Sequence, residues 1–256
     1  MSDDHVKRIQ EQFDRQGEAY ANLASVQEQK ILSAIVRLSR AGADDRVLDV
    51  ASGPGFIAMA FAPHCKEVVG VDVTETFLAS ARDEAHRRDL ENVTFEFGTV
   101  ESLPFEDAVF DVAVCRSAFH HFPNPDTVLS EMTRVVKPGG RLLILDMVAS
   151  EDAKKAAYHH KIEMLCDPTH AKALSPSEFT TLFEKHDLTI EMEREGQVEY
   201  PIDEWIGHGG PSTEAAETLR SLVTASVDED LAGLPIRKEG DTVMMGHYAK
   251  TYVLRS

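Results

Sequence analysis

Val47-Leu-Asp-Val-Ala-Ser-Gly-Pro-Gly-Phe56 is the stretch of sequence that decides the fold of this chain. Its first four residues form a short apolar run that is typical of a buried β-strand. Gly53 and Gly55 follow, and a backbone without a Cβ can turn tightly and approach a ligand closely. The helix expected over 55–62 presents unpaired N–H groups at its start. The stretch therefore predicts a strand, a ligand-binding turn and a helix.

A second apolar run, Val68-Val-Gly-Val71, ends in Asp72, seventeen residues beyond Gly55. A carboxylate placed there relative to a glycine-rich turn can accept hydrogen bonds from both hydroxyls of a ribose. Together, the turn and the acid predict a ligand that contains adenosine. They do not decide which one, because Gly53-Pro-Gly-Phe-Ile-Ala58 also satisfies the loose dinucleotide pattern GxGxxA.

Farther along the chain, β-rich runs alternate with helical segments. Strands are expected at 47–50, 68–71, 93–97, 110–114 and 141–145, and helices at 55–62, 75–88 and 125–136. This alternation predicts an α/β protein with a Rossmann-like, doubly wound, mostly parallel sheet that helices cover on both faces. Ligands on such sheets bind at the carboxyl ends of the strands.

Helical sequence flanks this region on both sides, and we expect a single domain over 1–256. Residues 1–42 show helical spacing and predict N-terminal helices, and 43–150 form the cofactor-binding core. The alternation stops after 150. The remaining 151–256 are expected to add helices to Cys166, over 176–185 and over 202–231, and strands at 188–199 and 243–254. This part would complete a seven-stranded sheet and supply a helical substrate lid.

Composition limits the partners that the chain can have. Asp and Glu number 44 against 26 Lys and Arg, and the net charge of −18 disfavours binding to nucleic acid. No signal peptide and no membrane-spanning stretch are evident, so we expect a cytoplasmic protein that does not associate with membranes. The three cysteines, Cys65, Cys115 and Cys166, are widely separated and indicate reduced thiols.

Further motifs follow the acid in order: Gly98-Thr-Val-Glu-Ser-Leu-Pro-Phe105, Phe110-Asp-Val-Ala-Val-Cys-Arg116, His120-His-Phe and Val135-Val-Lys-Pro-Gly-Gly-Arg. In this order and spacing the chain resembles class I S-adenosylmethionine-dependent methyltransferases, notably the branch that includes the ubiquinone and menaquinone C-methyltransferases. The resemblance spans roughly residues 10–150. It implies methyl transfer from S-adenosylmethionine to a small molecule.

The resemblance also implies which residues bind the cofactor. Asp49 would reach toward the methionine amino group, and Asp72 would hold the ribose. The other residues that the resemblance assigns to the cofactor are Ala51 and Gly53 for backbone contacts, Val73 and Phe77 beside the adenine, Thr99 and Val100 at the adenine edge, and Arg116 and Tyr20 near the methionine end. Ala51 departs from the family, which has a glycine there. Alanine fits this position if its φ is negative.

Chemistry on the acceptor side requires alignment of the nucleophile, and a base if the nucleophile carries a proton. The candidates are His120 and His121, which follow the fourth strand; packing within the loop is the alternative. In the expected lid, His159, Glu163 and Asp167 recur at i, i+4 and i+8. Such a stripe could bind a metal, but we interpret it as a solvated helix face and expect no metal.

Two other functions remain open at this point. The pattern GxGxxA would suit an NAD(P)-dependent oxidoreductase, although 151–256 lack the second βαβ half that a dinucleotide needs. A non-catalytic protein that binds S-adenosylmethionine is the other alternative, because fold alone does not imply catalysis. The acceptor atom is not indicated, and a homodimer stays open.

Overall fold

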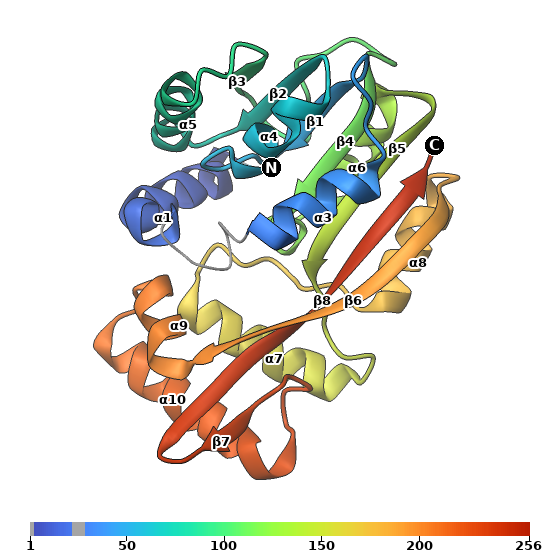
Figure 1. Cartoon of the computed structure of the whole chain (residues 1–256). Coiled ribbons are helices and arrows are strands. Elements are labelled where there is room, and N and C mark those ends of the chain that lie inside the picture. Colours follow the sequence, from blue (N-terminus) through green and yellow to red (C-terminus); the bar gives the residue numbers. More distant parts are fainter. Residues whose placement is uncertain (1–2, 22–28) are drawn as a thin grey trace.

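The computed structural model describes residues 3–21 and 29–256, with side chains from 4–13 and 29–256. One sheet runs through the molecule in the order β3-β2-β1-β4-β5-β8-β6, and a short β7 pairs with β8 (Figure 1). The strands are β1 (Arg46–Val50), β2 (Glu67–Asp72), β3 (Val93–Phe97), β4 (Phe110–Arg116), β5 (Val136–Met147), β6 (Thr189–Pro201), β7 (Arg237–Glu239) and β8 (Thr242–Arg255). Strands β1 to β5 pair in parallel, and β8 lies antiparallel between β5 and β6.

Helices cover the sheet on both faces. They are α1 (Asp3–Ala21), α3 (Gln29–Ser39), α4 (Phe56–Phe61), α5 (Glu75–Arg87), α6 (Pro125–Val135), α7 (Ala153–Cys166), α8 (Pro176–Lys185), α9 (Ile202–Gly209) and α10 (Thr213–Glu229), with 3₁₀ turns η1 (Ala62–His64) and η2 (Phe119–His121). None of the helices in this described part of the chain is long and apolar enough to cross a membrane.

The central strands are apolar on both faces because both faces are covered. Within β1, Leu48 and Val50 point into the core shared with α6 and α8, and Val47 points into the core shared with α3, α4 and α5. All three side chains are fully buried. Continuous burial is what parallel strands between two helix layers require, and it explains why these strands appear in the sequence as unbroken apolar runs.

A third apolar core belongs to the C-terminal helical unit, by which we mean α7, α9, α10 and β7 with the outer halves of β6 and β8. Its buried centre includes Ile162, Ile206, Leu219 and Met245. Strand β5 pairs with β8 over Ala249–Arg255, whereas β6 continues along β8 as far as Met244. The two long strands therefore extend past the sheet and carry the unit (Figure 1).

The sequence-based α/β expectation is confirmed, with two corrections. The expected helix over 202–231 is two helices, because Gly210 adopts a left-handed conformation after α9 and Ser212 caps the start of α10. The path of seven strands agrees with the expectation, but the three-residue β7 adds an eighth strand. This strand was not predicted because Arg237–Glu239 has no apolar alternation.

Candidate active site

The turn after β1 adopts an unusual backbone conformation. Ala51, Gly53 and Gly55 have φ angles of 56°, 50° and 79°. A Cβ on Gly55 would lie 2.5 Å from the ring of Phe95, so this position excludes other residues on space as well as on conformation. Ala51 does not meet the condition of a negative φ under which alanine would fit this position without strain. Its alanine occupies the left-handed region, which costs an L-residue roughly 1–2 kcal/mol.

Asp72, at the end of β2, holds this turn in place. One carboxylate oxygen accepts the N–H of Gly53 and the other accepts the N–H of Thr74, each at 2.8 Å. Burial raises the pKa of Asp72 in spite of these hydrogen bonds. The acid and the glycine turn are thus directly joined.

Asp49 is the second buried acid of the site. It is 1% exposed, and its Oδ2 accepts the N–H of Ala58 at 2.9 Å. Burial raises the pKa of Asp49 to about 8; the negative charge of Asp72 contributes, and Arg116 and the bond from Ala58 oppose it. Burial disfavours the ionised form of both carboxylates, and a positive charge beside them would restore it. The site therefore favours a ligand that carries positive charge.

One pocket opens over this turn and encloses about 840 Å³ of space, including its mouth. Most of the residues predicted to bind the cofactor line it. The predicted residues on its wall are Asp49, Ala51, Gly53, Asp72, Val73, Phe77, Val100, Arg116 and His121. Thr99 is absent from the wall and instead pairs with Ser102. The side chain of Tyr20 lies outside the described residues.

Sequence reasoning missed several parts of the wall. Ile9 and Phe13 of α1 close one side, and the Phe13 ring lies 5.6 Å from that of Phe77 and 5.5 Å from that of His121. The helical spacing of the N-terminal apolar residues indicated an apolar face, but not the surface that it covers. The other residues of the wall that were not predicted are Ser52, Pro54, Phe56, Ile57, Thr74, Ser117, Ala118 and Phe122.

The lining suits S-adenosylmethionine, whose sulfonium and ammonium groups carry positive charge. Asp49 and Asp72 supply the buried negative charge. The hydroxyl of Ser52, in the turn itself, is buried without a hydrogen-bond partner among the described residues. Buried hydroxyls of this kind are costly unless a ligand or water pairs with them.

His120 is held by the buried carboxylate of Asp146. Its Nδ1 lies 2.6 Å from Oδ1 of Asp146, and Oδ2 of the same carboxylate accepts the N–H groups of Ala118 and Phe119. Burial acts to lower the pKa of His120, but Asp146 outweighs burial, so the pKa is raised. His120 does not belong to the pocket wall.

His121 lies on the wall, and a short chain of hydrogen bonds orients its ring. Its Nδ1 is 3.1 Å from Oγ1 of Thr169, which donates its own proton to Asp167 at 2.6 Å. Since that hydroxyl proton is committed to a carboxylate, the Thr169 oxygen accepts from Nδ1–H of His121. Burial, followed by the charge of His120, lowers the pKa of His121. The ring is therefore neutral, with its lone pair on Nε2.

The stripe of His159, Glu163 and Asp167 is not the solvated face that we expected. His159 is 1% exposed and Glu163 is 5% exposed, and both face β8. The helix is covered on this side as well as on the side of Ile162. Apolar and polar residues are not separated onto different faces of this helix. The sequence pattern therefore could not show that both sides are buried.

Comparison with known proteins places the chain in one family. Residues 41–195 match the model of the family described as "Methyltransferase domain". A Bacillus subtilis protein named "Uncharacterized methyltransferase YcgJ" is 32% identical over 217 residues, which cover 85% of this chain and 86% of that protein. A demethylmenaquinone methyltransferase of Deinococcus radiodurans is 41% identical over 104 residues, 40% of this chain and 42% of that enzyme.

Solved structures agree with this assignment. The crystal structure of the Bacillus subtilis YcgJ protein has a TM-score of 0.83 at 30% identity and covers 88% of this chain and 97% of its own. A protein of Bacillus halodurans described as a "putative methyltransferase" also has a TM-score of 0.83, at 29% identity, and covers 88% of this chain and 97% of its own. The likeness thus includes the C-terminal helical unit.

Proposed function

Because the chain belongs to the family of S-adenosylmethionine-dependent methyltransferases, it transfers a methyl group from that cofactor, and we propose that the acceptor is an apolar small molecule that gives up a proton to His121. The position of His121 on the pocket wall, with Nδ1 held by Thr169, is the observation that carries this proposal. The comparisons give no support to the two alternative functions, an NAD(P)-dependent oxidoreductase and a non-catalytic protein that binds S-adenosylmethionine.

The cofactor roles follow from the pocket. Asp49 would face the methionine ammonium, and Asp72, which lies on the wall beside the glycine turn, would face the ribose. Val73 and Phe77 would flank the adenine, and Val100 would meet its edge. Arg116 lines the pocket near Asp49, where the carboxylate end of methionine would lie. The roles of Thr99 and Tyr20 rest on the family resemblance alone.

The acceptor side is mostly apolar. Ile9, Phe13 and Phe122 line the same pocket as His121, and the Phe13 ring packs edge-on against the His121 ring; Ser117 is a polar residue of this wall. Rings and alkyl groups pack well against such a surface, whereas a charged acceptor would lose its hydration without compensation. We therefore propose an aromatic or otherwise apolar acceptor. The C-terminal helical unit would act as its lid, and the acidic surface fits a cytoplasmic enzyme that does not bind nucleic acid.

The residues of the chain have to supply only part of the chemistry of methyl transfer. S-adenosylmethionine supplies an electrophilic methyl group, so the pocket has to align the nucleophile and exclude water. His121 would accept the proton of a hydroxyl or similar nucleophile at Nε2, while Thr169 and Asp167 hold the ring through Nδ1. His120, whose pKa is raised, would remain a positioning residue. Opposite pKa shifts in two adjacent histidines separate these roles.

The test is formation of S-adenosylhomocysteine with a panel of apolar phenols, quinols, thiols and tertiary amines. His121→Gln should lower kcat by 10²–10⁴-fold and leave cofactor binding unchanged. Thr169→Val should lower kcat less and move the acidic limb of the pH profile, because the ring loses its anchor. His86→Gln, at an exposed position of α5, is the matched control and should behave as the wild type.

The pH dependence has a defined sign. A base with a lowered pKa stays neutral to lower pH, so the acidic limb of kcat/KM should fall below pH 6.5, the ordinary value for histidine. Preferred methylation of tertiary amines, which carry no proton to lose, would contradict the proposal. An unchanged kcat in His121→Gln would contradict it as well.

A further inference from the structure

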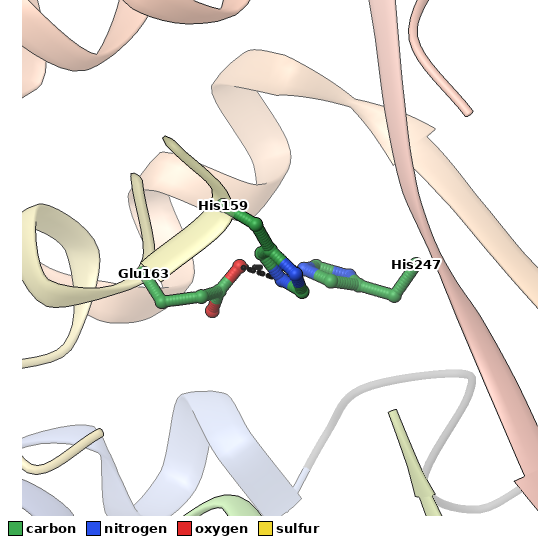
Figure 2. Close-up of side chains that lie close together, drawn as sticks. All are labelled: His159, Glu163 and His247. Atoms are coloured by element: carbon green, nitrogen blue, oxygen red, sulfur yellow. Dashed lines mark hydrogen bonds and ion pairs between the residues drawn. The ribbon is translucent and has the colours of Figure 1, made fainter. Parts of the chain in front are cut away.

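Outside the pocket, the C-terminal helical unit buries three potential metal ligands in one place. His159 and Glu163 lie one turn apart on α7, and His247 faces them from β8 (Figure 2). One ligand atom from each residue lies within 4.8 Å of the other two, and all three side chains are buried. The pocket wall described above includes none of them.

The distances inside this cluster are short. Nε2 of His247 lies 2.7 Å from Oε1 of Glu163, and Nε2 of His159 lies 3.4 Å from the same oxygen. Around a tetrahedral ion with bonds of about 2.1 Å, neighbouring ligand atoms are about 3.4 Å apart. The His159–Glu163 pair already has this spacing, and the His247–Glu163 pair would have to open by less than 1 Å.

An ion pair between Glu163 and His247 does not satisfy the cluster. It leaves His159 buried with only a 3.4 Å ion-pair contact from Nε2 to Glu163, and with Nδ1 in no hydrogen bond to any described residue. A ring nitrogen that is buried without a hydrogen-bond partner loses its hydration, at a cost of about 1–3 kcal/mol for each such group. A cation between Nε2 of His159 and Glu163 would replace this long contact by two metal–ligand bonds and would compensate the buried carboxylate.

A supporting contact orients one of the ligands. The hydroxyl of Tyr200 lies 2.9 Å from Nδ1 of His247. Histidines that bind metals commonly donate the proton of their other ring nitrogen to an oxygen, which fixes the tautomer and the ring orientation. Tyr200 is in position to accept that proton and would leave Nε2 of His247 for a metal. An i, i+4 pair on a helix plus one residue from a strand also matches common zinc-ligand spacing.

We propose that His159, Glu163 and His247 form a binding site for one divalent transition-metal ion of the Zn²⁺ class. Two imidazoles and one carboxylate suit Zn²⁺, Co²⁺ or Fe²⁺ and disfavour Mg²⁺ and Ca²⁺, which prefer all-oxygen sites. The ion would join α7 to β8 and so lock the C-terminal helical unit onto the extended strands. Water would complete the coordination.

The experiment treats the purified full chain with a chelator and then titrates it with Co²⁺, followed by its visible absorption, and with Zn²⁺ by calorimetry. We expect one equivalent of each ion, tetrahedral Co²⁺ bands and a higher Tm with metal. Mg²⁺ should not compete. A wild-type chain that binds neither ion overturns the proposal, whatever the variants do.

Variants locate the ion. Glu163→Gln keeps the shape of the side chain, and His247→Ala removes a ligand; each should weaken Co²⁺ binding at least 100-fold, since even the loss of a supporting partner weakens binding 10–100-fold. Tyr200→Phe should weaken it about tenfold for the same reason. His208→Ala removes a histidine of α9 outside the cluster and should bind as the wild type. If Glu163→Gln and His247→Ala both bind Co²⁺ with the affinity of the wild type, the ion binds elsewhere and the proposed site is contradicted.

Discussion

A single methyl group at Ala51 strains the turn that organises the pocket. The residue has a φ of 56° in a loop where the family resemblance has glycine. Ala51→Gly should therefore remove roughly 1–2 kcal/mol of strain, and after about 0.4–1 kcal/mol is subtracted for the extra freedom of glycine in the unfolded chain, stability should rise by about 1 kcal/mol. For a chain of this length, the gain corresponds to a rise in Tm of about 2–4 °C, measured by calorimetry.

The control for this prediction is the same exchange at a residue with ordinary conformation. Ala79 is exposed within α5, and Ala79→Gly should cost about 1 kcal/mol because glycine is a poor helix former. The two Ala→Gly substitutions should thus move Tm in opposite directions. If both lower it, the turn does not store the strain that its backbone conformation indicates.

The raised pKa of Asp49 links cofactor binding to pH. With a pKa of about 8 in the free protein, the carboxyl is mostly protonated at pH 7. A cation bound beside it would lower that pKa, so binding should release close to one proton. The affinity for S-adenosylmethionine should accordingly rise between about pH 6 and pH 8 and then level off.

Calorimetry in phosphate and in Tris at pH 7 measures this release, because the two buffers differ in their enthalpy of ionisation. Asp49→Asn should abolish the difference between buffers and weaken binding. The same variant should raise the Tm of the cofactor-free protein above pH 4, since a folded-state pKa raised from 3.8 means that stability is lost as pH rises toward 8. Identical enthalpies in both buffers for the wild type would refute the linkage.

At the scale of elements, Gly209 decides how closely α9 approaches α7. A Cβ at this position would lie 2.3 Å from Sγ and 2.6 Å from the carbonyl oxygen of Cys166. Gly209→Ala should therefore destabilise the chain by about 1–3 kcal/mol through overpacking. Gly207, on the same helix, has open space around its missing Cβ, and Gly207→Ala should be neutral or stabilising. Urea unfolding of the two variants tests the contrast, and equal midpoints would show that the helices can separate without cost.

Elements with local signals were predictable from the sequence. The strand, turn and acid around Asp49 and Asp72 follow from residue type and spacing, and the helix predicted over 176–185 forms as α8 at the same bounds. Burial of His159 and Glu163 was not predictable, because it depends on β8, some eighty residues away. The anchor of His121 on Thr169 likewise forms when distant segments meet.

At the scale of the whole molecule, α1 connects the cofactor core to the C-terminal helical unit. The side-chain amide of Gln10 donates to the carbonyl of Val73 at 2.6 Å, and that of Gln12 donates to the carbonyl of Gly209 at 3.0 Å. His5 bonds the carbonyl of His121 through Nε2 at 2.9 Å. The apolar face between these contacts lines the pocket. Occupation of the pocket should thus stabilise the packing of α1 against both parts.

Hydrogen exchange with and without S-adenosylhomocysteine measures this coupling. If α1 must detach for the ligand to leave, ligand at 100 times its Kd should slow exchange in residues 4–13 by up to about 100-fold, or about 2.7 kcal/mol. Helix α8 has no residue on the pocket wall and should exchange at the same rate in both states. Asp72→Ala, which should bind the ligand at least tenfold more weakly, should lose most of the protection at the same ligand concentration. Protection of the turn at 51–55 without any gain in α1 would show that the helix does not close the pocket, and access to His121 would then have to be controlled by the C-terminal helical unit alone.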